Sequence, residues 1–502
     1  MKRLATMLTN PNTLQILLAV ALLCRLVLIP NPGFEADISF WKSWGLAVRD
    51  FGIVKGLPLT NFNYPTPFAY VLALMAHIYS FFADPHNFNE FWNNSNLLFL
   101  AIAKAPSIIA DFGIFGILLW IGKNTKRLGF PQLPTTFYTL LALLYILNPL
   151  AMFDGALWGQ VDSVGVLLFL IANCMVFTKR PLLAGVIYMV AMMTKLQNMI
   201  YGPVFFLFIW QYLGFDGFIK ATGAALGTFL ALNFEFIGAR QMTRVAGDLT
   251  GNYDYFPWLS LNAYNVWWIV AKAHGMDISD KIAAIGILNA KTVGLFMFAS
   301  TYLLGILTML KGRFLRPSSI PVQQYNNITI EQSNNIFFRY FSSLIIVAAA
   351  FFLFQTESHD RYAFPITVFL LLWAPFWIQI ELRVTGYGLR VKQFLILYSV
   401  FCILFFYNIH NALIQNYPKN GIPILNILNI PALTIAASVA QIGLFGMFLY
   451  ILRKHITVLL FSIWIGVFIL LIVAGNSPLI FGKPVAITKL TPVTSTTGYG
   501  RR

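Results

Sequence analysis

Residues 97–121 read LLFLAIAKAPSIIADFGIFGILLWI, a long and mostly apolar run that ends just before Lys123. A run of roughly 17–25 such residues is long enough to cross a bilayer as a helix. Similar runs recur along the 502-residue chain, which is 58% hydrophobic and only 10% charged, with a mean hydropathy of +0.72. No soluble core of this size requires so apolar a composition. The sequence therefore predicts an all-α, multi-pass integral membrane protein.

Basic residues stand at the ends of the apolar runs and orient the predicted spans. They cluster at 123–127, 179–180, 311–316, 390–392 and 453–454. Because basic residues are enriched on the cytoplasmic side of membrane proteins, we place these ends in the cytoplasm. The net charge of +16 then reflects topology, and we expect no nucleic-acid partner. The three cysteines all lie in apolar runs and predict no disulfide or metal framework.

This orientation predicts about 13 spans. They are expected at 14–29, 97–121, 136–150, 158–177, 181–197, 199–214, 218–237, 289–310, 338–354, 363–380, 393–411, 430–452 and 456–475. A long external loop, 30–96, follows the first span, and its apolar stretch 67–82 is expected to be a juxtamembrane or re-entrant helix, because a crossing there would put Lys123 outside. Residues 238–291 are expected to form a second external loop. We divide the chain into a catalytic transmembrane module, 1–311, a cytoplasmic linker, 312–337, and a C-terminal transmembrane module, 338–502.

The few acidic residues gather on the external side. Of the 18, this topology leaves only Asp216, Glu331 and Glu381 in cytoplasmic segments. Acidic residues contribute little to orientation, so this bias was not imposed by the rule that oriented the chain. Ionisable groups at membrane depth are costly and usually functional. The distribution predicts an active site that faces the periplasm or exterior.

Glu35 and Asp37 come directly after the first span. A carboxylate at the boundary of water and lipid can accept a proton from an acceptor hydroxyl, although a solvated interfacial acid would have the same position. Lys104 and Asp111 lie nearly two helical turns apart on one span. They could hold helices together or take part in catalysis.

The segment 154–163, DGALWGQVDS, is a polar turn between two apolar runs. Asp154, Gln160 and Asp162 are candidates for sugar recognition, with helix capping as the simpler alternative. Lys195 and Gln197 interrupt a later apolar run. An ammonium group there can bind a phosphate, or it can snorkel to the interface.

Two short motifs complete the set of candidates. Tyr64 opens a Tyr-Pro-Thr-Pro sequence whose prolines suit the first turn of a helix. In His359-Asp360-Arg361-Tyr362, Arg361 can clamp a phosphate bidentately and His359 can donate to a phosphate or sugar oxygen. An ordinary hairpin turn would also account for this second motif.

Taken in order, these residues resemble the GT-C membrane glycosyltransferases that use polyprenyl-phosphate sugars. The chain looks like bacterial proteins related to the GPI-anchor mannosyltransferases and, more distantly, like the lumenal dolichyl-phosphate-glucose glucosyltransferases. The resemblance covers residues 15–380 and rests on the acidic pair, the Tyr-Pro-x-Pro motif, the 158–163 turn followed by Lys195-x-Gln197, and the 359–362 turn. It implies a GT-C-like bundle in a bacterial inner membrane.

The resemblance also implies roles for particular residues. The family places its catalytic carboxylate in the first external loop, and the glucosyltransferases have a Trp seven residues later. Asp37 with Trp44 fits this spacing, whereas Lys42 follows Glu35 at that distance. Asp37 is therefore the expected base, with Glu35 second. Lys195, His359 and Arg361 match the donor-phosphate region.

These expectations describe an inverting transfer of a hexose, mannose or glucose, from a polyprenyl-phosphate donor to a hydroxyl of a lipid-, glycan- or protein-linked acceptor. The glucosyltransferases carry a His and an aromatic residue where this chain has Trp158-Gly159, which leaves the sugar open. No cofactor is expected, and the scattered carboxylates predict no metal site. The alternative is a transporter or lipid flippase that uses the same carboxylates as proton or cation sites. A transporter would need a polar path through the membrane, whereas a transferase would need a one-sided cavity.

Overall fold

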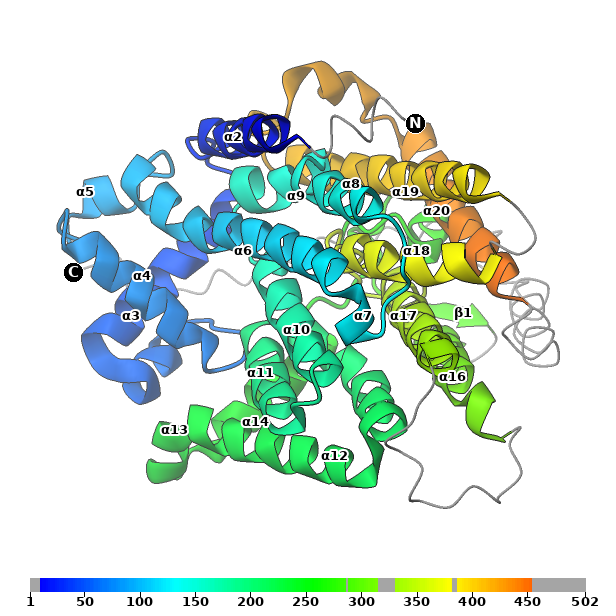
Figure 1. Cartoon of the computed structure of the whole chain (residues 1–502). Coiled ribbons are helices and arrows are strands. Elements are labelled where there is room, and N and C mark those ends of the chain that lie inside the picture. The colour runs from blue at the N-terminus through cyan, green and yellow to red at the C-terminus, as the bar shows by residue number, and fades with distance from the viewer. Residues whose placement is uncertain (1–9, 286–287, 315–329, 382–385, 454–502) are drawn as a thin grey trace.

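The computed structural model describes residues 10–285, 288–314, 330–381 and 386–453, which are mostly helical, with very little strand (Figure 1). Within these ranges, eight helical segments are long and apolar enough to cross a membrane, which is consistent with a multi-pass membrane protein. They are α2 (Pro11–Leu28), α6 (Leu97–Lys123), the segment Thr135–Trp158, the segment Leu196–Leu232, α16 (Ala290–Phe314), α17 (Ile330–Leu353), α19 (Tyr387–Asn416) and α20 (Pro431–Leu452). The segment Thr135–Trp158 comprises α8 (Thr135–Ile146), α9 (Pro149–Met152) and the π-helical η2 (Phe153–Trp158), and the segment Leu196–Leu232 comprises η3 (Leu196–Tyr201) and α12 (Gly202–Leu232).

The expected count of about 13 spans is not confirmed. Several apolar helices are too short to be counted with the eight: α4 (Phe68–Ser80), α10 (Asp162–Phe177), α11 (Pro181–Thr194) and α18 (Ile366–Glu381). The predicted spans 199–214 and 218–237 fall mainly on α12, which is kinked at Gly214 with φ 79° and ψ −178°. Glycine is the residue that adopts this backbone conformation readily. The predicted span 456–475 lies outside the described residues.

Polar side chains mark the starts of several helices. Asn10, Asn96 and Asn148 accept backbone N–H hydrogen bonds at the starts of α2, α6 and α9. The first N–H groups of a helix have no partner within the helix, and an Asn at this position supplies one. These caps help to set the first residues of the three helices. In contrast, α17 begins at Ile330, inside the predicted linker 312–337.

The predicted external loop 30–96 is largely helical. It contains α3 (Glu35–Gly56), η1 (Leu57–Leu59), α4 and α5 (Phe88–Phe91), which lie beside α6 in Figure 1. With 13 residues, α4 is about 20 Å long, which is less than the thickness of a hydrocarbon core. A Cβ at Gly45 would collide with the backbone of Leu72, so the absence of a side chain lets α3 pack closely on α4.

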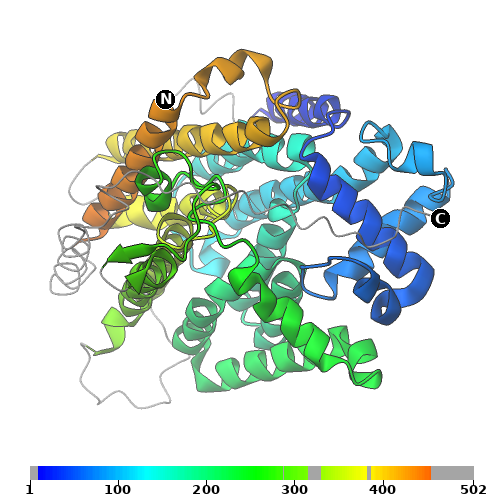
Figure 2. The same ribbon diagram turned by 180° about the vertical axis from the view of Figure 1, so that it is seen from behind.

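As predicted, the segment 238–291 contains no full span. It holds α14 (Met242–Thr250), η4 (Gly251–Asp254), α15 (Val266–Val270) and the antiparallel strands β1 (Ala283–Ile285) and β2 (Leu288–Asn289), and α13 (Phe234–Gly238) precedes it. Figure 2 shows this green segment on the same face as the blue helix α3. Arg244 donates to the carbonyl of Phe62 at 3.1 Å and Tyr70 donates to Glu235 at 2.7 Å, so side chains tie the two regions together. Two short helices, α7 (Thr125–Leu128) and η6 (Pro423–Leu428), complete the fold.

A buried ion pair joins three of the helices. Arg25 Nε on α2 lies 2.9 Å from Asp111 Oδ2 on α6, and the hydroxyl of Tyr145 on α8 donates to Asp111 Oδ1 at 2.9 Å. Of the two roles considered for Asp111, holding helices together agrees with these contacts. Its partner is Arg25, however, and not Lys104.

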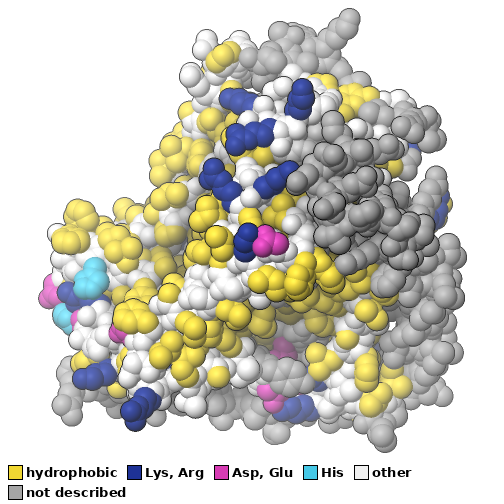
Figure 3. Space-filling model, turned by 60° about the horizontal axis from the view of Figure 1, so that its bottom comes forward, with side chains coloured by type: hydrophobic (Ala, Val, Ile, Leu, Met, Phe, Trp, Pro, Cys, Tyr) yellow, Lys and Arg dark blue, Asp and Glu magenta, His cyan; other side chains and the backbone are white. Residues whose placement is uncertain are grey.

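Much of the outer surface is hydrophobic, as Figure 3 shows for the face at the bottom of the molecule. Only 11% of the α2 segment is buried, and the side chains of Ile16, Leu23 and Val27 are more than half exposed. Apolar surface of this extent suits contact with lipid and would be a liability in water.

Candidate active site

A cavity of about 690 Å³ lies between α3, the segment 249–261 and the turn after α17. Six of the predicted site residues line it: Asp37, Tyr64, Lys195, Gln197, His359 and Arg361. Its volume is within the range of small-molecule sites, which is about 300–1,000 Å³. These residues come from four separate parts of the chain, so the fold brings them together.

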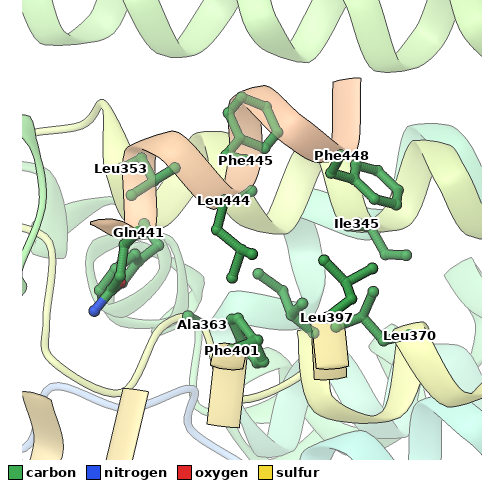
Figure 4. Close-up of a pocket in the computed structure, with 13 residues that line it drawn as sticks. Ile345, Leu353, Ala363, Leu370, Leu397, Phe401, Gln441, Leu444, Phe445 and Phe448 are labelled. Atoms are coloured by element: carbon green, nitrogen blue, oxygen red, sulfur yellow. The ribbon is translucent and has the colours of Figure 1, made fainter. Parts of the chain in front are cut away.

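A second cavity, of about 50 Å³, lies between α17, α18, α19 and α20 (Figure 4). The side chains around it are apolar except that of Gln441. This lining offers no acid, base or cation to a reaction. The larger cavity is therefore the candidate active site.

The connection between α2 and α3 packs directly on η2. Gly33 has φ 65°, and a Cβ at this position would overlap with the carbonyl oxygen of Trp158. The next residue, Phe34, donates its N–H to that oxygen at 3.3 Å, and its ring stacks on Trp158 with centroids 5.1 Å apart. These contacts fix the first turn of α3, which carries Asp37.

The carboxylate of Asp37 faces both the cavity and the 158–160 turn. Trp158 Nε1 donates to Asp37 Oδ2 at 3.2 Å, and Gln160 Nε2 donates to the same oxygen. Arg361 Nη1 lies 4.0 Å away. The Asp37 side chain is 22% exposed, so it is held in place without being sealed from the cavity.

Gln160 connects this acid to a cation. While its amide nitrogen donates to Asp37, its Oε1 accepts from Lys195 Nζ at 3.4 Å. Lys195 also forms an ion pair of 2.6 Å with Asp162, the first residue of α10. Asp162 and Gln160 thus stand behind the cavity wall and hold the ammonium group that lines it.

Arg361 is surrounded by carboxylates. Its guanidinium lies 3.3 Å from Asp360, 3.8 Å from Asp162 and 4.0 Å from Asp37, and it stacks over Trp158 at 5.1 Å. Burial lowers the pKa of Arg361, but these three carboxylates outweigh burial and raise it. The group is therefore a fixed positive charge.

The neighbours of Arg361 in the turn differ in charge state. Burial and the nearby cations lower the pKa of His359 well below its usual value, so its imidazole is neutral near pH 7. Burial raises the pKa of Asp360 to about 7, although Arg361 opposes the shift. His359 can donate a hydrogen bond to a bound oxygen but adds no charge to the site.

Lys104 on α6 holds the two segments that frame Asp37. Its ammonium is buried and donates to the carbonyls of Ile29 at 3.0 Å, Asn31 at 2.6 Å and Leu157 at 2.9 Å. The first two carbonyls precede α3 and the third lies in η2. Sequence reasoning noticed Lys104 but assigned it the wrong partner.

Besides Gln160 and Asp162, two more predicted site residues lie outside the cavity lining, Glu35 and Asp154. Glu35 accepts from Asn94 at 2.6 Å and from Asn420 at 3.0 Å, so both of its oxygens hold neighbouring segments. Asp154 is buried, and its Oδ2 has no hydrogen-bond partner within the part of the chain that the structure describes.

Aromatic residues form a wall that sequence reasoning identified only in part. Trp41 and Trp44 on α3 line the cavity beside Tyr64, whose ring stacks on Phe68 at 5.0 Å. The sequence indicated Tyr64 and, by its spacing from Asp37, Trp44, but not Trp41. The position of Trp41 four residues after Asp37, on the same helical face, is the signal that would have identified it.

A second group of charges lies at the same cavity. Lys291 and Glu357 line it and are 2.6 Å apart, and Lys291 is also 2.8 Å from Asp254 and 4.0 Å from Asp280. The three carboxylates are close enough to share a cation, and Lys291 supplies a positive charge at that position. Sequence reasoning did not connect these residues, since they come from the two ends of the 254–291 segment and from the 357 turn.

Comparison of the chain with protein-family models and with curated proteins found no match. The candidate site therefore rests on the geometry described above.

Proposed function

We propose that this protein is an inverting glycosyltransferase that moves a hexose, mannose or glucose, from a polyprenyl-phosphate donor to an acceptor hydroxyl. The observation that carries the proposal is that one carboxylate, Asp37, and two cations, Lys195 and Arg361, line the same cavity. The charge distribution along the sequence supports a site on the non-cytoplasmic face, and the resemblance to GT-C enzymes supports a bacterial inner membrane.

In the proposed reaction, the acceptor oxygen forms a bond to the anomeric carbon as the bond from that carbon to the phosphate oxygen breaks. Asp37 takes the proton of the acceptor hydroxyl, which requires hydrogen-bond reach in the bound state. The polyprenyl phosphate leaves with the bonding electron pair. Lys195 and Arg361 stabilise the charge that develops on it, and His359 donates a hydrogen bond. Because attack and departure occur on opposite faces of the carbon, one step inverts its configuration.

The extent of the cavity favours this reading over a transporter. Asp111 and Asp154 are buried acids, and neither lines the cavity. A transport path would have to connect such groups with the cavity, because alternating access exposes a site to both sides. A cavity bounded by Asp37, Lys195 and Arg361 instead suits a reaction at one side.

The test is transfer from a panel of radiolabelled polyprenyl-phosphate sugars in membranes with and without the protein. Asp37→Asn should reduce kcat by at least about 100-fold, because it removes a general base but keeps the side-chain shape. Glu35→Gln should keep most of the activity, since Glu35 holds Asn94 and Asn420 outside the cavity. Asp216 is an acid on α12 whose side chain is 78% exposed, so Asp216→Asn is the matched control. Full activity of Asp37→Asn, or equal losses in Asp37→Asn and Glu35→Gln, would contradict the assignment.

A further inference from the structure

The cavity has a second polar end whose chemistry differs from that of the first. At the first end, the charged side chains that line the cavity are those of Asp37, Lys195 and Arg361, which leaves one net positive charge to attract a phosphate. At the second end, the charged side chains that line the cavity are those of Lys291 and Glu357, which are 2.6 Å apart and balance each other. This second end therefore has no excess of positive charge with which to attract a phosphate.

The two ends lie at a spacing that suits two adjoining ligands. Glu357, His359 and Arg361 are alternate residues of one turn, and all three line the cavity. Four residues of chain reach no further than about 14 Å, so the backbone at Glu357 is within that distance of the backbone at Arg361. Arg361 is in turn 4.0 Å from Asp37. A ligand at Glu357 is thus within the length of a small glycan from the proposed transfer point.

The backbone at Glu357 is held in an unusual conformation. Its φ is 57°, a left-handed value that is uncommon for residues other than glycine, and its N–H donates to the carbonyl of Trp258 at 3.0 Å. Strained residues persist where the surroundings hold them, and they concentrate at binding and catalytic sites. Here the conformation turns the Glu357 carboxylate toward the cavity and Lys291.

Aromatic rings extend from this end toward Arg361. The ring of Phe256 meets His359 edge-on at 5.8 Å, and His359 lies 5.1 Å from Tyr362. Tyr255, which is 42% exposed, lines the cavity beside Phe256. An exposed ring next to hydrogen-bonding carboxylates is the usual surface for a sugar, which presents an apolar face and a rim of hydroxyls.

We propose that the end around Glu357, Lys291 and Tyr255 is the acceptor subsite and that it binds an uncharged, sugar-like headgroup. This inference rests on the proposed function. Glu357 accepts hydrogen bonds from the hydroxyls of this headgroup, and Lys291 both donates to it and keeps the carboxylates in place. Tyr255 covers its apolar face. An acceptor that carries a phosphate at this position is selected against.

The test compares two soluble probes, hexyl α-mannoside and its 6-phosphate, using the donor that the wild-type protein accepts. Direct binding of each probe to the detergent-purified protein is measured in parallel. The wild type should bind the neutral probe at least tenfold more tightly than the phosphorylated one. Glu357→Gln and Tyr255→Ala should each raise the KM and the Kd of the neutral probe by about tenfold and leave the KM of the donor unchanged. Tyr450→Ala, which removes a ring on α20 that is 57% exposed and lies outside the cavity lining, is the matched control.

Equal binding of the two probes by the wild type would overturn the proposal, as would an unchanged Kd in both variants. A rise of the donor KM in parallel with the acceptor KM would also overturn it, because it would show that Glu357 only supports the fold of the cavity. Tyr255→Ala keeps the test valid if Glu357→Gln fails to fold, since an exposed ring is tolerant of removal. Selective binding of the neutral probe without any transfer would retain the subsite and instead contradict the proposed function.

Discussion

Two arginine–aspartate pairs in this protein differ in the distance between their charges and in their exposure. Arg25 and Asp111 are 2.9 Å apart, and their side chains are 0% and 1% exposed. Arg361 and Asp37 are 4.0 Å apart, and their side chains are 11% and 22% exposed. The first pair is in direct contact and closed to ligands. The second pair faces the cavity, and Arg361 is also close to Asp162 and Asp360.

The difference shows how to recognise an ion pair that is available to a substrate. In the buried pair, Arg25 also donates to the carbonyls of Ala21 and Ile146, and Tyr145 completes the hydrogen bonds of Asp111. In the cavity pair, the guanidinium and the carboxylate are 4.0 Å apart and both side chains line the cavity, so a ligand in the cavity can contact either of them. A loose pair at a cavity wall is thus the better candidate for chemistry.

Removing Asp111 should have the largest effect on stability. Asp111→Ala leaves Arg25 as an unpaired buried charge, which costs about 3–5 kcal/mol. Asp37→Ala should cost much less, because Asp37 is partly exposed. Thermal unfolding of the two variants in the same detergent measures the contrast. Equal destabilisation by the two substitutions would contradict the conclusion that the Arg25–Asp111 pair supports the fold more than the Arg361–Asp37 pair does.

Arg361→Lys should raise the KM of the donor by about tenfold without unfolding the protein. Lysine keeps the charge but loses the planar fork that binds a phosphate through two parallel hydrogen bonds. Arg240→Lys, at an exposed position away from the cavity, is the matched control. Steady-state kinetics with the radiolabelled donor measure the effect, and an unchanged donor KM would exclude Arg361 from phosphate binding.

The smallest expected effect is a pH dependence of stability. The pKa of Asp360 is raised to about 7 by burial, so the folded state binds a proton that the unfolded state releases near pH 4. The contribution of Asp360 to the free energy of unfolding is therefore fully present below about pH 4 and is lost as the pH rises to about 7. Asp360→Asn should therefore narrow the difference in unfolding temperature between pH 5 and pH 8. An identical difference in wild type and variant would show that Asp360 does not titrate in this range.

Hydropathy predicted the positions of the helices well and their limits poorly. Lipid requires long apolar runs, so segments such as 97–121 were visible in the sequence. The kink at Gly214 and the start of α17 at Ile330 depend on single torsions and local contacts, which hydropathy does not record. Hydropathy also does not reveal α3, which the sequence predicted only as part of the external loop 30–96.

The site was predictable where polar residues interrupt apolar sequence. Lys195 was selected for that reason, Arg361 for its place in a polar turn between two apolar runs, and Asp37 for its place after the first span and its spacing from Trp44; the structure brings all three to one cavity, while their roles remain predictions. Contacts between distant residues were not visible, as with Arg25 and Asp111, which are 86 residues apart. Nothing in a single sequence shows that Glu35 faces two asparagines whereas Asp37, two positions later, faces the cavity.

The tight approach of Gly33 to η2 bears on which changes this chain can accept. Gly33 and Gly52 both have positive φ, but a Cβ at Gly33 would occupy the space of a carbonyl oxygen, whereas Gly52 has nothing within 4 Å. At Gly52, a φ of 74° and a ψ of 165° by themselves restrict the position to glycine, whereas at Gly33 the carbonyl oxygen of Trp158 excludes a Cβ in addition to the positive φ. A side chain at Gly33 would therefore displace either η2 or the first turn of α3, which carries Asp37, whereas one at Gly52 would disturb only the local backbone.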